Sequence, residues 1–201
     1  MKLLEPFRLG SLTLPNRLVM APLTRRRASF GKLPNALMTE HYAQRASAGL
    51  IISESTEVDP RSAPDVPTRP GLFNAAQTDA WRHVTDQVHE AGGRIFVQLS
   101  HLGRAAHPLM LTGGSEPVAP SPIAATGFAY TSQGLQPFPI PRPLALRDIP
   151  RIIDQFAHAA KLALKAGFDG VEIHSANGYL IDQFLRSGSN QGSDAYGGSA
   201  L

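Results

Sequence analysis

The sequence predicts an α/β fold with parallel strands. Four short apolar runs alternate with longer segments in which apolar residues recur at helical spacing. Near-continuous apolar runs of this length are typical of strands buried on both faces of a parallel sheet. Polar residues follow each run, at the strand ends where a parallel barrel carries its functional site. A doubly wound sheet and a (β/α)8 barrel both fit this alternation.

The predicted elements follow one another along the chain. A helix that starts near Asn35 ends before Gly49, a residue suited to a helix C-terminus. Thr78 is the expected N-cap of a second helix, which carries Trp81 on its apolar face, and Asp148 is the expected N-cap of a third. The predicted strands are residues 17–23, 50–54, 94–99 and 170–174, and the predicted helices are residues 35–48, 78–91 and 148–166.

One connection is long. Residues 101–147 are rich in Pro and Gly, so they are expected to be largely irregular. Long irregular loops are uncommon in compact domains and often act as lids over a site. No Gly-x-Gly-x-x-Gly pattern follows the first strand, which weighs against a dinucleotide-binding sheet.

Composition excludes several classes of protein. The chain has 201 residues, of which 42% are hydrophobic and 17% charged, as expected for one globular domain. It has no 18-residue apolar run and no N-terminal signal pattern, so we expect a cytoplasmic protein without a membrane partner. The absence of cysteine excludes disulfides and thiol nucleophiles. The net charge is +3 and the basic run at residues 25–27 lacks interleaved aromatic residues, so no nucleic-acid partner is expected.

Residues 174–184 (HSANGYLIDQF) form the most informative segment. The amide of Asn177 and a ring N–H of His174 can point at one oxygen and stabilise negative charge that develops there. The phenol of Tyr179 can protonate a carbanion formed by attack on an activated alkene. The polar residues at the four strand ends are Thr24; Ser53, Glu54 and Ser55; Gln98, Ser100 and His101; and His174 and Asn177.

Other interpretations of these residues stay open at this point. A single His at a strand end, a Tyr in a first helical turn and a Gln in a strand are each often structural. A serine nucleophile lacks the Gly-x-Ser-x-Gly pattern. A metal site would need ligands brought together from separate segments, because no helix carries a His pair on one face, and no metal is expected. The residues that could contribute to such a site are His101, His107, His174, Glu54 and Glu172.

Several motifs, taken in order, resemble the Old Yellow Enzyme family of FMN-dependent NAD(P)H oxidoreductases. The resemblance covers essentially the whole chain and implies a (β/α)8 TIM barrel with FMN at the C-terminal face of its strands. The motifs are residues 16–24 (NRLVMAPLT), 42–54 (YAQRASAGLIISE), 93–99 (GRIFVQL), 118–121 (VAPS), 174–184 (HSANGYLIDQF) and 196–199 (YGGS).

The resemblance also implies roles for individual residues. The Thr24 hydroxyl would lie near the carbonyl side of the flavin, and Gln98 would bond its pyrimidine edge. The implied contacts to FMN are Pro22, Leu23, Thr24, Ser55, Gln98 and His174. The implied catalytic residues are His174 and Asn177, which would hold a carbonyl or nitro oxygen of a small-molecule substrate, and Tyr179, which would donate the proton. In this scheme NADH or NADPH reduces FMN, and the flavin then gives hydride to an enone or nitro-alkene.

Three features depart from the family pattern. Ser100 stands where many relatives carry Trp, and Gly192 replaces a common Arg. Residues 1–201 correspond to the N-terminal part of the FMN-binding barrel domain, about the first four βα units, with the long loop after the third strand. The phosphate contacts of such barrels lie after later strands. An alternative hypothesis is therefore a truncated, non-catalytic half-barrel with weak or no FMN binding, which self-associates through its open strand edges.

Overall fold

The computed structural model describes residues 2–62 and 68–198. Contacts between Cα atoms divide the chain into two compact units. The first unit comprises Met1–Thr56, Pro67–Leu99 and His158–Ile173, and the second comprises Glu57–Val66, Ser100–Ala157 and His174–Leu201. Ser199, the last residue of the 196–199 motif, lies outside the described residues.

The first unit is built on a parallel sheet, as the sequence predicts. Its strands lie in the order β11 (Gly170–Ile173), β6 (Ile95–Ser100), β4 (Leu50–Ile52) and β3 (Val19–Met20), and β5 (Thr56–Glu57) also pairs with β6. Each of the four predicted strands is confirmed, but the first is much shorter than expected. Because β3 ends at Met20, the Pro22–Thr24 segment follows the strand as a loop.

The two edge strands of this sheet present apolar side chains to solvent. Val19 of β3 is 52% exposed and Ile173 of β11 is 53% exposed. Parallel strands are ordinarily covered on both faces and paired on both sides. Self-association through these edges stays a prediction.

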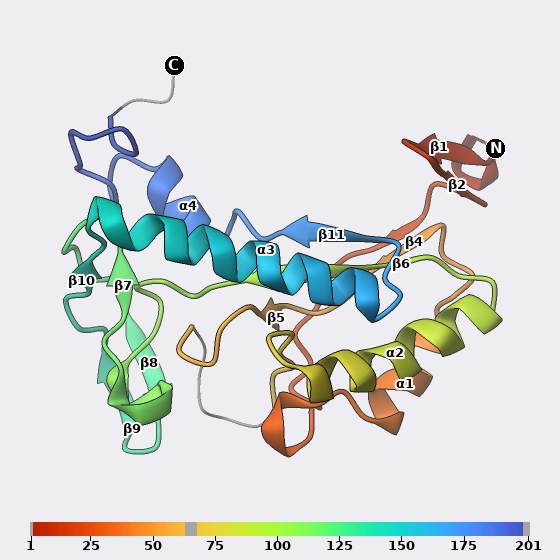
Figure 1. The fold of residues 1–201 in the computed structure, drawn as a ribbon, viewed down its shortest axis with the longest axis horizontal. Coiled ribbons are helices and arrows are strands. Elements are labelled where there is room, and N and C mark those ends of the chain that lie inside the picture. The colour runs from red at the N-terminus through yellow and green to blue at the C-terminus, as the bar shows by residue number, and fades with distance from the viewer. Residues whose placement is uncertain (1, 63–67, 199–201) are drawn as a thin grey trace. The chain divides into compact units, whose positions relative to one another are not determined.

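Two helices of the first unit lie side by side (Figure 1): α1 (Ala36–Ala43) and α2 (Ala75–Glu90). The predicted N-cap of α2 is wrong. Asn74 caps the helix, because its Oδ1 accepts a hydrogen bond from the Gln77 backbone N–H at 2.9 Å. Thr78 lies inside the helix, where its hydroxyl donates to the Asn74 carbonyl oxygen at 2.9 Å.

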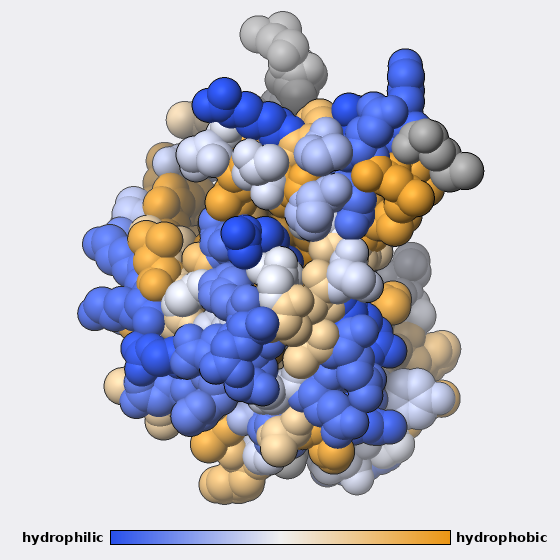
Figure 2. All heavy atoms as spheres, turned by 90° about the vertical axis from the view of Figure 1, so that its right-hand side faces the viewer, coloured by the Kyte–Doolittle hydropathy of each residue, from blue (hydrophilic) through white to orange (hydrophobic). Residues whose placement is uncertain are grey.

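The core of the first unit is centred on Trp81 of α2, which is fully buried. Its ring meets Phe168 edge-on with the centroids 5.2 Å apart, and its Nε1–H donates to the Gly71 carbonyl oxygen at 3.2 Å. The opposite face of α2 is polar, and Figure 2 shows hydrophilic residues gathered on the face of the molecule where α1 and α2 lie. The exposed polar residues of α2 are Asp79, Arg82, His83, Asp86, Gln87 and Glu90. The unit also contains the short helices η1 (Lys2–Leu4) and η2 (Phe30–Lys32) and the antiparallel hairpin β1 (Phe7–Leu9)–β2 (Leu12–Leu14).

The second unit corrects the expectation of an irregular connection at 101–147. This segment contains a parallel pair, an antiparallel hairpin and three single-turn helices. The pair is β7 (Val118–Ala119) with β10 (Arg142–Pro143), the hairpin is β8 (Phe128–Thr131) with β9 (Gly134–Pro137), and the turns are η3 (Pro108–Met110), η4 (Thr112–Gly114) and η5 (Leu146–Asp148). Helix α4 (Leu180–Leu185) also belongs to this unit.

Helix α3 (Ile149–Lys165) begins in the second unit and ends in the first. The predicted cap, Asp148, is the last residue of η5. Its Oδ2 accepts hydrogen bonds from the Ala145 backbone N–H at 3.3 Å and from Arg142 Nη1 at 2.9 Å. Asp148 therefore stabilises the turn before α3. Among the described residues, no helix is both long and apolar enough to cross a membrane.

Candidate functional site

In the first unit, the candidate residues gather where the parallel strands end. Pro22, Leu23 and Thr24 follow β3, and Leu23 is 64% exposed. The next residue anchors this loop, because the backbone N–H of Arg25 donates to Glu54 Oε2 at 3.2 Å. Since Glu54 lies two residues past the end of β4, this hydrogen bond ties the loops of two neighbouring strands together.

Glu54 is fully buried and is held by a second residue, Tyr42 of α1. The Tyr42 hydroxyl donates to Glu54 Oε1 at 3.2 Å and accepts from the Glu54 backbone N–H at 2.9 Å. Burial raises the pKa of Glu54, although the hydrogen bonds from Arg25 and Tyr42 act to lower it. Burial also raises the pKa of Tyr42. The sequence placed Glu54 among the polar residues at the strand ends and among the possible metal ligands, but it did not reveal this hydrogen-bond network.

Replacing Tyr42 by phenylalanine is expected to lower the free energy of unfolding by about 2 kcal/mol. The change leaves a buried N–H and a buried carboxyl oxygen without a partner. Chemical denaturation followed by circular dichroism measures the loss. Tyr130→Phe is the matched control, because Tyr130 is 77% exposed and its hydroxyl makes no hydrogen bond to a described residue. Equal unfolding free energies for Tyr42→Phe and Tyr130→Phe would contradict the structural role given to the hydroxyl.

Ser55 and Gln98 are both buried and already have partners in the first unit. The Ser55 hydroxyl oxygen accepts from Nη2 of the buried Arg69 at 2.9 Å. Gln98 Nε2 donates to Glu172 Oε1 at 2.7 Å, because residues 98 and 172 face each other across β6 and β11. Arg69 and this Gln98–Glu172 pair were not identified from the sequence.

In the second unit, the structure brings His174 and Tyr179 together. Their rings meet edge-on, with the centroids 4.9 Å apart and the planes at 88°. The chain turns between them through Asn177 and Gly178, which both have left-handed backbone conformations with φ of 59° and 71°. His174 is buried, whereas Asn177 is exposed, and its side-chain amide makes no hydrogen bond to the described residues.

Side chains of α4 hold this turn in place. The Gly178 backbone N–H donates to Asp182 Oδ2, and Gln183 Nε2 donates to the Gly178 carbonyl oxygen, both at 2.7 Å. Burial acts to raise the pKa of Asp182, but hydrogen bonds from Arg186 and Gly178 lower it overall. Tyr179 itself packs against the buried residues Leu102, Ala106 and Leu111. Asp182 and Gln183 therefore fix the position of Tyr179, a role that the sequence analysis did not assign.

The histidines considered as metal ligands have other partners. His101 Nδ1 accepts from the Gly103 backbone N–H at 3.0 Å, and His107 Nδ1 accepts from the Leu109 N–H at 3.2 Å. Within residues 2–62 and 68–198, no three His, Asp or Glu side chains lie close enough together to hold a metal ion.

The residues at the strand ends fit the ring of a flavin. The pyrimidine edge of a flavin carries both hydrogen-bond donors and acceptors, and the Thr24 hydroxyl and the Gln98 amide offer both kinds of group. Leu23, which precedes Thr24 in the chain, is exposed and offers apolar surface. The set assigned from the resemblance contains no Lys or Arg that would bind the FMN phosphate.

Comparison with known proteins decides the family. A family model described as "NADH:flavin oxidoreductase / NADH oxidase family" matches residues 2–200. The chain belongs to this family. Its relatives include a probable flavin mononucleotide-dependent alkene reductase of Leishmania infantum, 45% identical over 98% of this chain and 55% of the relative. Another is 12-oxophytodienoate reductase 7 of Oryza sativa subsp. japonica, 45% identical over 98% of this chain and 50% of the relative.

Solved structures support the same conclusion. An Old Yellow Enzyme homologue from Zymomonas mobilis is 49% identical, with a TM-score of 0.93 over 99% of this chain and 55% of that one. Morphinone reductase is 46% identical, with a TM-score of 0.92 over 98% of this chain and 54% of that one. The predicted Old Yellow Enzyme resemblance and the barrel fold class are confirmed. The chain spans about half the length of the relatives it matches.

Proposed function

We propose that the protein is an FMN-dependent NAD(P)H oxidoreductase that reduces activated alkenes such as enones and nitro-alkenes. The observation that carries the proposal is the contact between His174 and Tyr179 beside an unengaged Asn177 amide. The phenol of Tyr179 makes no hydrogen bond to a described residue, so it is available to a ligand. Two of the relatives, one named a probable alkene reductase and the other a 12-oxophytodienoate reductase, agree with this reaction class.

In the proposed reaction, bound FMN supplies the hydride, which it obtains from NADH or NADPH. His174 and Asn177 hold the carbonyl or nitro oxygen of the substrate and stabilise the negative charge that develops on it. Tyr179 transfers its phenolic proton to the α-carbon. The edge-on packing against His174 and the anchoring by α4 restrict the phenol to one position, which is the protein's contribution to this step.

The proposed flavin contacts are Pro22, Leu23, Thr24, Ser55, Gln98 and His174. We place residues 1–201 as the N-terminal part of one FMN-binding barrel domain in the cytoplasm. Gln98 Nε2 donates one hydrogen bond to Glu172, which leaves its second N–H and its Oε1 to bond a flavin. The Glu54–Arg25 hydrogen bond holds the loop that carries Thr24.

Flavin spectroscopy tests the proposal. The purified protein is expected to retain visible flavin absorbance after excess FMN is removed. NADH or NADPH should bleach this absorbance without oxygen, and an enone should restore it. A protein that stays colourless with excess FMN would instead support the non-catalytic half-barrel. A protein that binds FMN but is not reoxidised by enones or nitro-alkenes would contradict the alkene as substrate.

A further inference from the structure

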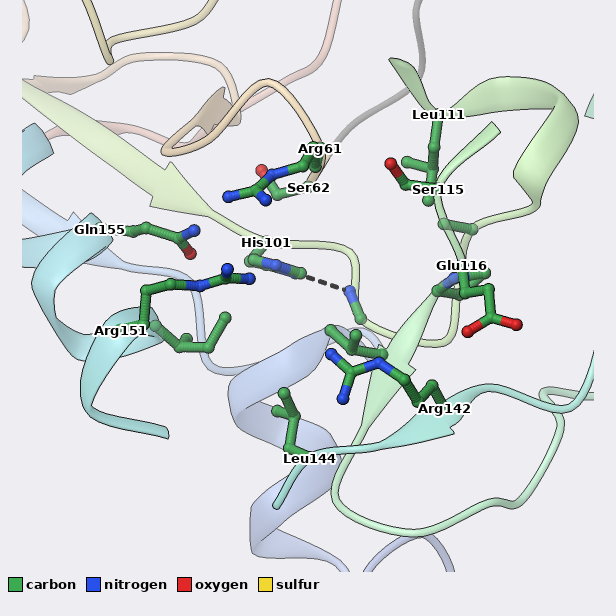
Figure 3. A pocket seen from close by; sticks show the side chains of 15 residues that line it. Arg61, Ser62, His101, Leu111, Ser115, Glu116, Arg142, Leu144, Arg151 and Gln155 are labelled. Atoms are coloured by element: carbon green, nitrogen blue, oxygen red, sulfur yellow. Dashed lines mark hydrogen bonds between the residues drawn. The ribbon is translucent and has the colours of Figure 1, made fainter. Parts of the chain in front are cut away.

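The second unit contains a cavity of about 260 Å³. Its lining includes none of the residues that we propose to bind FMN or substrate. Three arginines from separate segments contribute to it: Arg61 from the loop after β5, Arg142 from β10 and Arg151 from α3. In Figure 3 the three guanidinium groups point toward the same space around His101. Guanidinium groups converge in this way where carboxylates or phosphates are bound.

Two of these arginines are held in place by ion pairs. Arg61 Nε lies 3.2 Å from Asp59 Oδ1, and Arg142 Nη1 lies 2.9 Å from Asp148 Oδ2. Each pair fixes a guanidinium plane while leaving other N–H groups of that plane for a ligand. Arg151 is exposed and forms no ion pair within the described part of the chain. It therefore supplies the uncompensated positive charge.

His101 lines the cavity and can donate a hydrogen bond from its neutral ring. The residue is buried, and its Nδ1 accepts from the Gly103 N–H, which leaves the proton on Nε2. Burial lowers its pKa to about 4, although nearby Asp59 acts to raise it. At neutral pH His101 thus presents an N–H without a charge.

One buried acceptor also lines the cavity. Gln155 Nε2 donates to Asp59 Oδ2 at 2.7 Å, whereas Gln155 Oε1 is buried without a hydrogen-bond partner among the described residues. A buried polar atom without a partner costs free energy that a bound donor would recover. Glu116, the acidic residue in the lining, is exposed, and in Figure 3 its carboxylate points away from Arg61 and Arg151.

We propose that this cavity binds the phosphate group of a small molecule. The arginines and His101 supply donors for the phosphate oxygens, and Gln155 Oε1 accepts from the protonated oxygen of a monohydrogen phosphate. Sulfate carries no such proton at neutral pH. The proposal does not depend on flavin binding or on alkene reduction.

Calorimetric titration at constant ionic strength tests the site with inorganic phosphate as the probe. Phosphate is expected to bind saturably with one site per chain, and about tenfold more tightly than sulfate, which leaves Gln155 Oε1 unpaired. Glycerol 3-phosphate in a parallel titration shows whether a phosphate monoester is accommodated as well as the free ion. Tighter binding of glycerol 3-phosphate than of inorganic phosphate would show that the site prefers a phosphate monoester.

Arg151→Gln is expected to weaken phosphate binding about tenfold, because it removes charge-assisted hydrogen bonds. Arg147→Gln is the matched control, since Arg147 is exposed, lies outside the cavity and carries the same charge. Unchanged melting temperatures for both variants confirm that the fold persists. Absence of saturable binding to the unaltered chain, equal affinity for sulfate, or equal weakening by the two variants would each overturn the proposal.

Discussion

Replacing Tyr179 by phenylalanine is expected to slow the reduction of an activated alkene about 10²- to 10⁴-fold. The rate at which NADH or NADPH reduces the flavin should not change, because that step needs no phenolic proton. The ring keeps its packing against His174 and against the Leu102, Ala106 and Leu111 cluster. The variant should therefore fold normally and lose only the proton donor.

Stopped-flow measurement of the two half-reactions separates these outcomes for the FMN-loaded protein. Tyr196→Phe is the control, because it removes a phenol that is 45% exposed and has no proposed role. An unchanged rate of alkene reduction in Tyr179→Phe would exclude this residue as the proton donor, and Asn177 and His174 would then keep only their binding roles. Slower flavin reduction in the same variant would point to a disturbed nicotinamide position.

Acidification from pH 6.5 to 4 is expected to remove about 3 kcal/mol of stability through His101 alone. Burial lowers the pKa of this histidine from 6.5 to about 4 in the folded chain. Within that window the unfolded chain binds a proton that the folded chain does not. The contribution of neutral His101 to the free energy of unfolding is therefore fully present above pH 6.5, and it falls as the pH decreases toward 4.

The variant His101→Asn isolates this contribution. The asparagine Oδ1 can accept the hydrogen bond from Gly103 that His101 Nδ1 accepts, but the side chain does not titrate. Urea denaturation at several pH values should give a shallower loss of stability for the variant than for the unaltered chain. Burial and nearby Arg25 and Arg45 also lower the pKa of His41 to about 4, so part of the acid sensitivity remains. Identical pH profiles would show that His101 has the same pKa in the folded and the unfolded chain, which would contradict the effect of burial.

The parallel sheet could be predicted because its strands are short apolar runs separated by helical patterns. The start of α2 could not be predicted to the residue, because Asn74 and Thr78 are both good N-cap residues and lie one turn apart. Asn74 caps α2 because the preceding loop ends there and the helix begins at Ala75. The β8–β9 hairpin was missed, although Gly134, with φ of 85°, is the turn signal that could have revealed it.

The sequence predicted which residues form the candidate site and that they follow the ends of the parallel strands. His174 and Tyr179 were expected to act together, and the structure places their rings in contact. The supporting pairs could not be predicted, because they depend on strand register and helix placement. Gln98 meets Glu172 only in the observed register of β6 and β11, and Tyr42 reaches Glu54 only where α1 packs.

The left-handed backbone at Asn177 limits which substitutions can remove its side-chain amide without changing the turn. Alanine at this position would remove the amide and also impose a strain of about 1–2 kcal/mol, which could displace the neighbouring phenol. Glycine tolerates the same φ, so Asn177→Gly deletes the side chain while preserving the turn. The difference in activity between the glycine and alanine variants would then measure what the bend itself contributes to catalysis.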